Sequence, residues 1–491
     1  MILRAASLVL LLAVSAGFSS GNPEYFTPKH QITGIGLARH EMSPEVMALR
    51  ADNMIQAQTF AILRDPQALA GAKRITEMHP LFEKAAVAAG IPTSLLSAIA
   101  YLESWGDPNA ESPAGCKGIM QFAQATAREA GLQIVYATRY KIAATRQATK
   151  NKKGKVVFRT VQSRTPYTVK VRDDRFTPEL AVPATAKYLR RLSESFGSLD
   201  WAVFAYHCGE GCVTQMQALT RDALGESRHD LPTVQQMFFT ASPAHHRELY
   251  DAIQRHMLRD FSPTYWFRIK RAEQLLTLYQ EEPDAFRALR AEYRNPYNPD
   301  KRVNDRLSLW LKAEDVVYQS GDDLRSAQGK SLAPAPNDPR FFGFALAGLK
   351  TSGLNRDLYL QASPPAVGTL TYIAFEARRL FDAMRPKNEK WVPLDVVELV
   401  STKDGPREAG GSGGGAAAPE IPAHGTGQVF DIDIAGLPRG EREALWFVLN
   451  ELGWDGYLGY VELSGTSLHI GCAPSAREFF TSVFQEIAAS P

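Results

Sequence analysis

Residues 101–122 read YLESWGDPNAESPAGCKGIMQF, and this stretch decides the fold of the region around it. It follows a run in which Leu95, Ile99 and Leu102 recur at helical spacing, which predicts an amphipathic helix. That helix cannot continue through Trp-Gly-Asp-Pro, because glycine and proline interrupt helical backbone. We therefore expect Glu103 at the C-terminal end of the helix.

A carboxyl group at that position has an unusual environment. It meets the negative end of the helix dipole and neighbours Trp105, and both effects favour its protonated form. An acid that holds its proton near neutral pH is what the cleavage of a glycosidic bond needs. Glu103 is therefore a candidate catalytic residue, and the alternative is an ordinary solvated glutamate at a helix end.

Further motifs bear on this choice. Residues 115–121 read GCKGIMQ, residues 205–211 read AYHCGEG, and residues 174–178 read DRFTP. With the Glu-Ser pair at Glu103, they resemble the soluble lytic transglycosylase family, which is related to goose-type lysozyme. In that family a Glu-Ser helix end, a Gly-x-x-Gly-Leu-Met-Gln loop and an Ala-Tyr-Asn-Ala-Gly-x-Gly turn line one cleft. The DRFTP segment is similar to the family's Asp-x-Arg-x-x-Pro segment, although here its Asp and Arg are adjacent.

The resemblance covers roughly residues 80–220 and predicts an α-helical lysozyme-like domain over 80–235. It implies that the substrate is peptidoglycan and that the MurNAc-β-1,4-GlcNAc bond is cleaved without a cofactor. The family's mechanism has a single catalytic carboxyl group, which would first protonate the leaving oxygen. It would then take the proton of the muramyl 6-hydroxyl, so that a 1,6-anhydro ring closes. The sugar's N-acetyl group replaces the second carboxylate of ordinary glycosidases.

The resemblance also assigns roles to single residues. Glu103 would be the catalytic acid and base, and Tyr206 would position it. Met120 and Gln121 would contact the glycan, and Ser104 would support the site with a hydrogen bond. The glycines of the GCKG segment would permit a tight loop that brings backbone against the sugar.

The third motif departs from the family pattern. His207 stands where Asn is usual, and we expect it to bond to backbone as Asn does. Cys116, Cys208 and Cys212 all fall in loops that the family fold places around the cleft. A bridge from Cys116 to either of the other two, a local Cys208–Cys212 bridge and free thiols all remain open, and no partner can be assigned to Cys472.

A basic insertion interrupts the predicted domain at about residues 139–172. Between Arg139 and Arg175 the chain has twelve basic and two acidic residues, whereas its overall net charge is +2. Alternating Val156, Phe158 and Val169 predict a pair of strands. Such a segment suits anionic cell-envelope partners, with a solvated hairpin as the alternative. Its sparse aromatic residues argue against nucleic acid as a partner.

The whole chain has 491 residues, which predicts several domains. Residues 1–16 have the charged start, apolar run and small-residue site of a signal peptide, with an uncleaved anchor as the alternative. We therefore predict export to the periplasm or cell envelope. Residues 17–79 would form an N-terminal extension, and residues 236–330 a helical linker region.

The last part of the chain, residues 337–491, has a mixed pattern of strands and helices. The predicted fold class is thus multidomain: an α-helical lysozyme-like domain with a helical extension, followed by a small α+β domain. His424 and Asp431 are seven residues apart across a Gly-containing turn into a predicted strand, and His469 lies in a later strand. Two imidazoles and a carboxylate suit zinc with one open position.

This pattern resembles the zinc peptidases related to D-alanyl-D-alanine carboxypeptidases and lysostaphin. Their first motif is His-x-x-Gly-x-Ala-x-Asp, and their last ligand is a late His. The resemblance implies a Zn²⁺ site made by His424, Asp431 and His469, and a module that binds or trims stem peptides. The usual catalytic side chains near the last His are replaced by Thr466 and Ser467, which leaves the peptidase activity open. The alternative is a pair of ordinary histidines.

The leading function is therefore a lytic transglycosylase with a C-terminal peptidase-like module. A lysozyme that hydrolyses the same bond is the second possibility. A cell-wall-binding protein without activity is the third.

Overall fold

The computed structural model describes residues 25–32, 43–150, 152–225, 230–257, 264–293, 311, 315–349, 356–402, 423–463 and 466–490. Contacts divide the chain into two compact units, each made of separate stretches. The helical unit comprises residues 65–210 and 268–290. The sheet unit comprises residues 1–64, 211–267 and 291–491.

The helical unit is a bundle in which α6 packs against α3, α4 and α7, and α4 also packs against α2 and α3. Its core contains Phe82, Leu96, Ile99, Leu189 and Trp201, all of them 0% exposed. Its helices are α2 (Ala68–Glu77), α3 (His79–Ala89), α4 (Thr93–Ser104), α5 (Gln124–Glu129), α6 (Pro178–Phe196), α7 (Leu199–Cys208), most of α11 (Tyr265–Glu281) and most of α12 (Pro283–Tyr293).

Helix α4 ends where the sequence predicts. Trp105 caps it in the left-handed conformation, with φ of 52°, and its backbone N–H bonds to helix carbonyls. Glu103 therefore lies in the last turn of α4. The end of this helix is fixed by local sequence, because the glycine and proline that follow cannot extend it.

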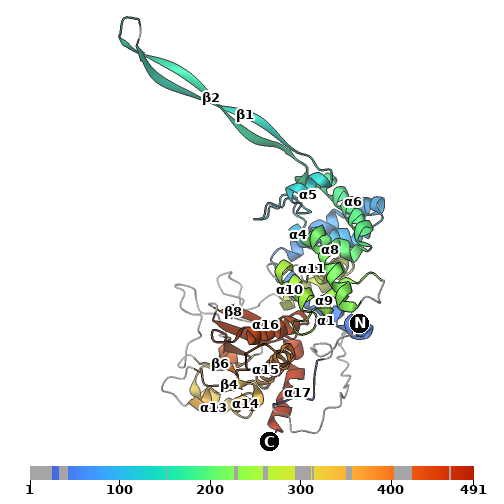
Figure 1. The fold of residues 1–491 in the computed structure, drawn as a ribbon, viewed down its shortest axis with the longest axis vertical. Coiled ribbons are helices and arrows are strands. Elements are labelled where there is room, and N and C mark those ends of the chain that lie inside the picture. Colours follow the sequence, from blue (N-terminus) through green and yellow to red (C-terminus); the bar gives the residue numbers. More distant parts are fainter. Residues whose placement is uncertain are drawn as a thin grey trace. The chain divides into compact units, whose positions relative to one another are not determined.

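The basic insertion forms a long two-stranded antiparallel ribbon, as the alternating pattern predicts. It consists of β1 (Ile134–Lys150) and β2 (Val156–Asp173), with a bulge after Val135. The ribbon leaves the helical unit between α5 and α6 and projects away from both helices (Figure 1).

The sheet unit is built on a five-stranded sheet with the strand order β4-β6-β7-β9-β8. β4 and β6 are parallel, and the other neighbours are antiparallel. Helix α15 contacts α16, α17 and the central strands β7 and β9. The strands are β4 (Phe344–Ala345), β6 (Leu394–Glu398), β7 (Val429–Asp433), β8 (Leu458–Leu463) and β9 (Ser467–Cys472); the helices are α15 (Pro364–Met384), α16 (Arg439–Trp454) and α17 (Arg477–Ala488).

Segments far from the sheet in sequence also belong to this unit. Helix α1 contacts α16, and its buried Arg50 forms ion pairs with Glu451 and Asp455 at 2.5 and 3.1 Å. The domain boundaries that we predict near residues 79, 235 and 336 do not coincide with the limits of the two compact units. Contacts such as those of α1 with α16 join distant stretches of sequence into one unit. The boundaries therefore stay predictions. The remaining elements of the unit are α1 (Pro44–Leu63), α8 (Glu210–Leu224), α9 (Val234–Thr240), α10 (Arg247–Met257), α13 (Gly321–Ala327), α14 (Pro339–Phe342), β3 (Ala333–Pro334) and β5 (Gln361–Ala362).

The predicted signal peptide, residues 1–16, lies outside the described residues. Among the residues that the structure describes, no helix combines the length and the apolar character that crossing a membrane requires. Export therefore stays a prediction from the sequence.

Candidate functional site

The first candidate site lies where α4 meets the loop of residues 110–122. Glu103 is half-buried in the last turn of the helix, and Ser104 is 7% exposed. The Ser104 hydroxyl donates to the Ile119 carbonyl at 2.7 Å and lies 3.1 Å from the carbonyl of Ala100. Ser104 thus ties the loop to the helix end beside Glu103.

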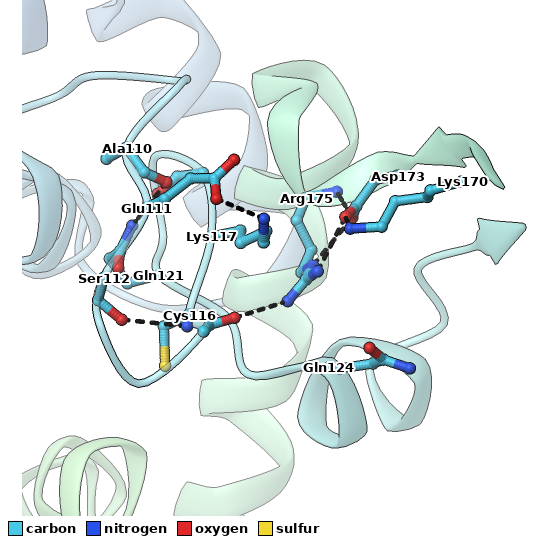
Figure 2. Close-up of polar contacts among 12 residues, drawn as sticks. Ala110, Glu111, Ser112, Cys116, Lys117, Gln121, Gln124, Lys170, Asp173 and Arg175 are labelled. Carbon is cyan, nitrogen blue, oxygen red and sulfur yellow. Dashed lines mark hydrogen bonds and ion pairs between the residues drawn. The ribbon is translucent and has the colours of Figure 1, made fainter. Parts of the chain in front are cut away.

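The loop is held in shape by its own polar groups (Figure 2). The Gln121 amide nitrogen donates to the carbonyls of Ala110 at 3.1 Å and Gly118 at 3.0 Å, and Gln121 itself has a φ of 50°. Lys117 forms an ion pair with Glu111 at 2.5 Å. The amide N–H groups of Gln121 thus serve the loop, and the predicted contact of Gln121 with the glycan stays a prediction.

Arg175 locks this loop from the other side. The side chain is 2% exposed, and its Nη1 donates to the carbonyls of Gly115 at 3.3 Å and Phe122 at 3.0 Å. Its Nε and Nη2 donate to the carboxylate of Asp173 at 2.9 and 2.8 Å (Figure 2). A buried bidentate pair of this kind fixes the guanidinium in one orientation.

The partner of Arg175 corrects the sequence interpretation. The family-like segment was read as starting at Asp174, next to Arg175. The structure pairs Arg175 with Asp173, so the segment is Asp173-x-Arg175-x-x-Pro178 with the regular spacing. Asp174 instead accepts from the backbone of Gln133 at 2.9 Å. Burial favours a raised pKa for Asp173, but the hydrogen bonds and charges of Arg175 and Lys170 outweigh it and hold that pKa below its usual range.

Gly118 cannot be replaced without moving backbone. Its φ is +79°, and a Cβ atom there would lie 1.7 Å from the carbonyl oxygen of Arg175. Two parts of the protein backbone therefore approach each other closely here, and the approach of the loop backbone to a sugar stays a prediction. A side chain at this position would push the loop away from Arg175.

Tyr206 connects the third motif to the loop. Its hydroxyl donates to the Met120 carbonyl at 2.5 Å, and its ring lies 6.1 Å from that of Phe122. Burial raises the pKa of Tyr206 well above its usual value, and the charge of Glu103 raises it further. The positioning of Glu103 by Tyr206 stays a prediction.

The predicted role of Met120 is wrong for its side chain. Met120 is 0% exposed, so its thioether belongs to the core and presents no surface to a glycan. Its contribution to the site is the backbone carbonyl that accepts from Tyr206. Cys116 is a free thiol. Neither of the two bridges considered for it, to Cys208 or to Cys212, is therefore present in the structure.

The second candidate site lies on the sheet. His424 precedes β7, whereas Asp431 and His469 are directly paired on β7 and β9. One ligand atom from each of the three residues lies within 4.8 Å of the others, and all three side chains are buried. Asp431 Oδ1 is 3.1 Å from His424 Nε2 and 2.6 Å from His469 Nδ1.

The surroundings of this cluster suit a metal ion. His424 Nδ1 is 2.6 Å from the Leu399 carbonyl, which fixes the imidazole so that Nε2 faces Asp431. Burial on its own would raise the pKa of Asp431, but the charges and hydrogen bonds of the two histidines hold it well below its usual range. The two histidines thus favour the ionised form of this carboxyl group, which is the form that binds metal ions. The donor set of two imidazoles and one carboxylate fits zinc.

Sequence reasoning missed one carboxyl group near these ligands. Glu398 on β6 lies opposite Asp431 in the sheet register and is 7% exposed. Position 466, where the related carboxypeptidases have a glutamate, holds the exposed Thr466. The pairing of β6 with β7 was the missing signal.

Comparisons with known proteins agree with the first site. Residues 80–154 and 155–227 match the family model described as the Transglycosylase SLT domain, and the break falls in the turn between β1 and β2. The chain is 42% identical over 156 residues to the membrane-bound lytic murein transglycosylase F of Desulfosudis oleivorans, covering 30% of this chain and 26% of that protein. The protein of the same name in Alcanivorax borkumensis is 27% identical, over 36% of this chain and 31% of that protein.

A third relative is the peptidoglycan transglycosylase gp16 of Escherichia phage T7, which is 35% identical over 27% of this chain and 8% of its own length. The chain thus spans less than a third of each of these curated relatives. The residues that match the family model contain the α4 end, the loop and the Tyr206 motif. Residues 80–227 are therefore the part of the chain that is similar to the Transglycosylase SLT domain.

Proposed function

We propose that this protein is a peptidoglycan lytic transglycosylase with Glu103 as its catalytic acid and base. The observation that carries the proposal is the half-buried Glu103 at the end of α4, beside a loop held by Ser104, Arg175 and Tyr206. The names of the three relatives support the same substrate and reaction.

The proposed chemistry uses one carboxyl group twice. Glu103 donates its proton to the oxygen between MurNAc and GlcNAc as that bond breaks. The resulting carboxylate then accepts the proton of the muramyl 6-hydroxyl, whose oxygen attacks the anomeric carbon and closes the 1,6-anhydro ring. In this proposal the glycan runs along the loop of residues 110–122 that carries Gln121. Tyr206 acts as a positioning residue.

The test is mass spectrometry of the products released from purified sacculi. Wild-type protein is expected to release 1,6-anhydro-muropeptides, and Glu103→Gln is expected to release none, because an amide has no acidic proton to give. Glu77→Gln is the matched control, since Glu77 is an exposed carboxylate on α2. Glycan binding by Glu103→Gln should persist in a sacculus pull-down.

The same measurement separates the other possibilities. Products with reducing ends would show a lysozyme-type hydrolase. Binding without release of muropeptides by the wild type would show a non-catalytic cell-wall-binding protein. Undiminished release by Glu103→Gln would falsify the assignment of the acid.

A second proposal concerns the sheet unit. We propose that His424, Asp431 and His469 hold a zinc ion, and that this module binds or trims the stem peptides of peptidoglycan. The buried three-residue cluster supports the metal site. A zinc ion with an open position polarises a peptide carbonyl and activates water. Glu398 is the carboxyl group that the sheet register offers in place of the missing acidic side chain.

Metal analysis of the purified full-length protein tests the site. About one zinc per chain is expected for the wild type and none for His424→Ala/His469→Ala. The matched control is His79→Ala/His245→Ala, which removes two histidines outside the cluster. A native protein without zinc, even after incubation with the ion, would remove this proposal.

We also propose that the protein acts in the periplasm or cell envelope. The predicted signal peptide and the names of the membrane-bound relatives support this location. Fractionation of cells that produce the full chain tests it, and recovery in the cytoplasmic fraction alone would contradict it.

A further inference from the structure

The ribbon of β1 and β2 has a composition unlike that of the rest of the chain. From Ile134 to Arg172 it has eleven Lys and Arg residues and no Asp or Glu. The strands span seventeen and eighteen residues, which corresponds to roughly 55 Å of extended chain. The positive charge is therefore spread along a thin projection rather than gathered around the proposed glycan cleft.

The ribbon also exposes apolar side chains that a solvated hairpin does not need. Ile142 is 63% exposed, Val156 58% and Phe158 65%. The register pairs Ile142 with Arg164, Ala148 with Phe158 and Lys150 with Val156. Because residues two apart on a strand share a face, all of these side chains lie on one face of the outer half of the ribbon.

We call the residues Ile142, Arg146, Lys150, Val156, Phe158 and Arg164 the outer ribbon face. They combine three cations with three large apolar side chains. In the described chain β1 and β2 form a sheet of two strands only, and a two-stranded sheet without further packing is marginally stable in water. A partner that covers this face would remove apolar surface from water and neutralise the charge at the same time.

We propose that the outer ribbon face binds the surface of an anionic phospholipid bilayer. Lys and Arg interact with the lipid phosphates, while Phe, Ile and Val enter the boundary between headgroups and acyl chains. A soluble polyanion accounts for the charge alone. It offers no place for three exposed apolar side chains that alternate with the cations, and a bilayer interface does. The contact would hold the helical unit at a membrane surface.

The test is co-sedimentation of the full-length protein with vesicles of equal parts phosphatidylglycerol and phosphatidylcholine, and with pure phosphatidylcholine vesicles. Binding to the first and not to the second is expected. Arg146→Gln/Arg164→Gln should weaken binding roughly fivefold per charge, about 25-fold in total. Ile142→Ser/Phe158→Ser should weaken binding to the anionic vesicles at least tenfold. The binding that remains should be sensitive to salt.

The matched control is Lys84→Gln/Lys187→Gln, which removes two exposed charges from α3 and α6 and should change binding less than threefold. All variants should keep the wild-type circular dichroism spectrum and release of muropeptides, since none of these residues contacts the proposed active site. Failure to bind anionic vesicles, or equal binding to neutral ones, would overturn the proposal. The proposal would also be overturned if Ile142→Ser/Phe158→Ser bound anionic vesicles as well as the wild type and duplex DNA competed fully with the vesicles. That result would indicate a soluble polyanion as the partner.

Discussion

The end of α4 and the His424 cluster on the sheet are built by opposite means. At α4, the buried polar side chains bond to backbone carbonyls and to each other, and Glu103 is left half-buried at the edge. On the sheet, the three polar side chains are themselves buried and face one another. Under the proposed functions, the first arrangement would present one acid to a substrate, whereas the second would present a set of ligands to an ion.

This difference predicts that the two sites fail independently. Glu103→Gln should lower the release of muropeptides at least a thousandfold, on the scale of the loss of an essential general acid, and leave the zinc content unchanged. His424→Ala/His469→Ala should abolish zinc binding and leave muropeptide release within about twofold. Mass spectrometry of products and metal analysis on the same preparations measure both. A common loss in either variant would contradict the separation.

The next largest effect is expected from the ion pair of Arg175 and Asp173, which supports the loop of residues 110–122. Arg175→Met leaves the buried carboxylate of Asp173 without its main partner, which should lower the free energy of unfolding by about 3 kcal/mol. Chemical denaturation followed by tryptophan fluorescence measures this. Arg190→Met is the control, because Arg190 pairs with Glu194 on the surface and its loss should cost less than about 1 kcal/mol.

Tyr206→Phe should have a smaller effect. It removes one hydrogen bond to the Met120 carbonyl, which should lower the free energy of unfolding by about 1 kcal/mol. Muropeptide release should fall more than stability alone explains, because Tyr206 also neighbours Glu103. Rates measured well below the melting temperature separate the two contributions. An unchanged rate would restrict Tyr206 to a structural role.

The last expected effect is a pH dependence of the helical unit. The pKa of Asp173 is lowered in the folded protein, so its ion pair stabilises the fold above the unfolded pKa of about 4. This contribution is lost as the pH falls below that value. Thermal melts of the wild type between pH 5 and pH 2 should therefore show a decline that is shallower in Asp173→Asn. Parallel curves for the two proteins would contradict the assignment.

The sequence determined the elements whose causes are local. The helix end at Glu103 follows from the glycine and proline after it, and the ribbon follows from alternating residues on both sides of a turn. The strands that bear Asp431 and His469 were predicted, because short apolar runs bounded by turn residues identify them.

Only the tertiary structure decided which side chains meet. The choice of Asp173 over Asp174 as the partner of Arg175, the burial of Met120 and the position of Glu398 opposite Asp431 depend on strand register and packing. Neighbouring residues on a strand face opposite sides, so a shift of one position changes a partner without changing the pattern. Local sequence therefore predicts that a strand or helix forms, while contacts between distant segments decide which of its residues act.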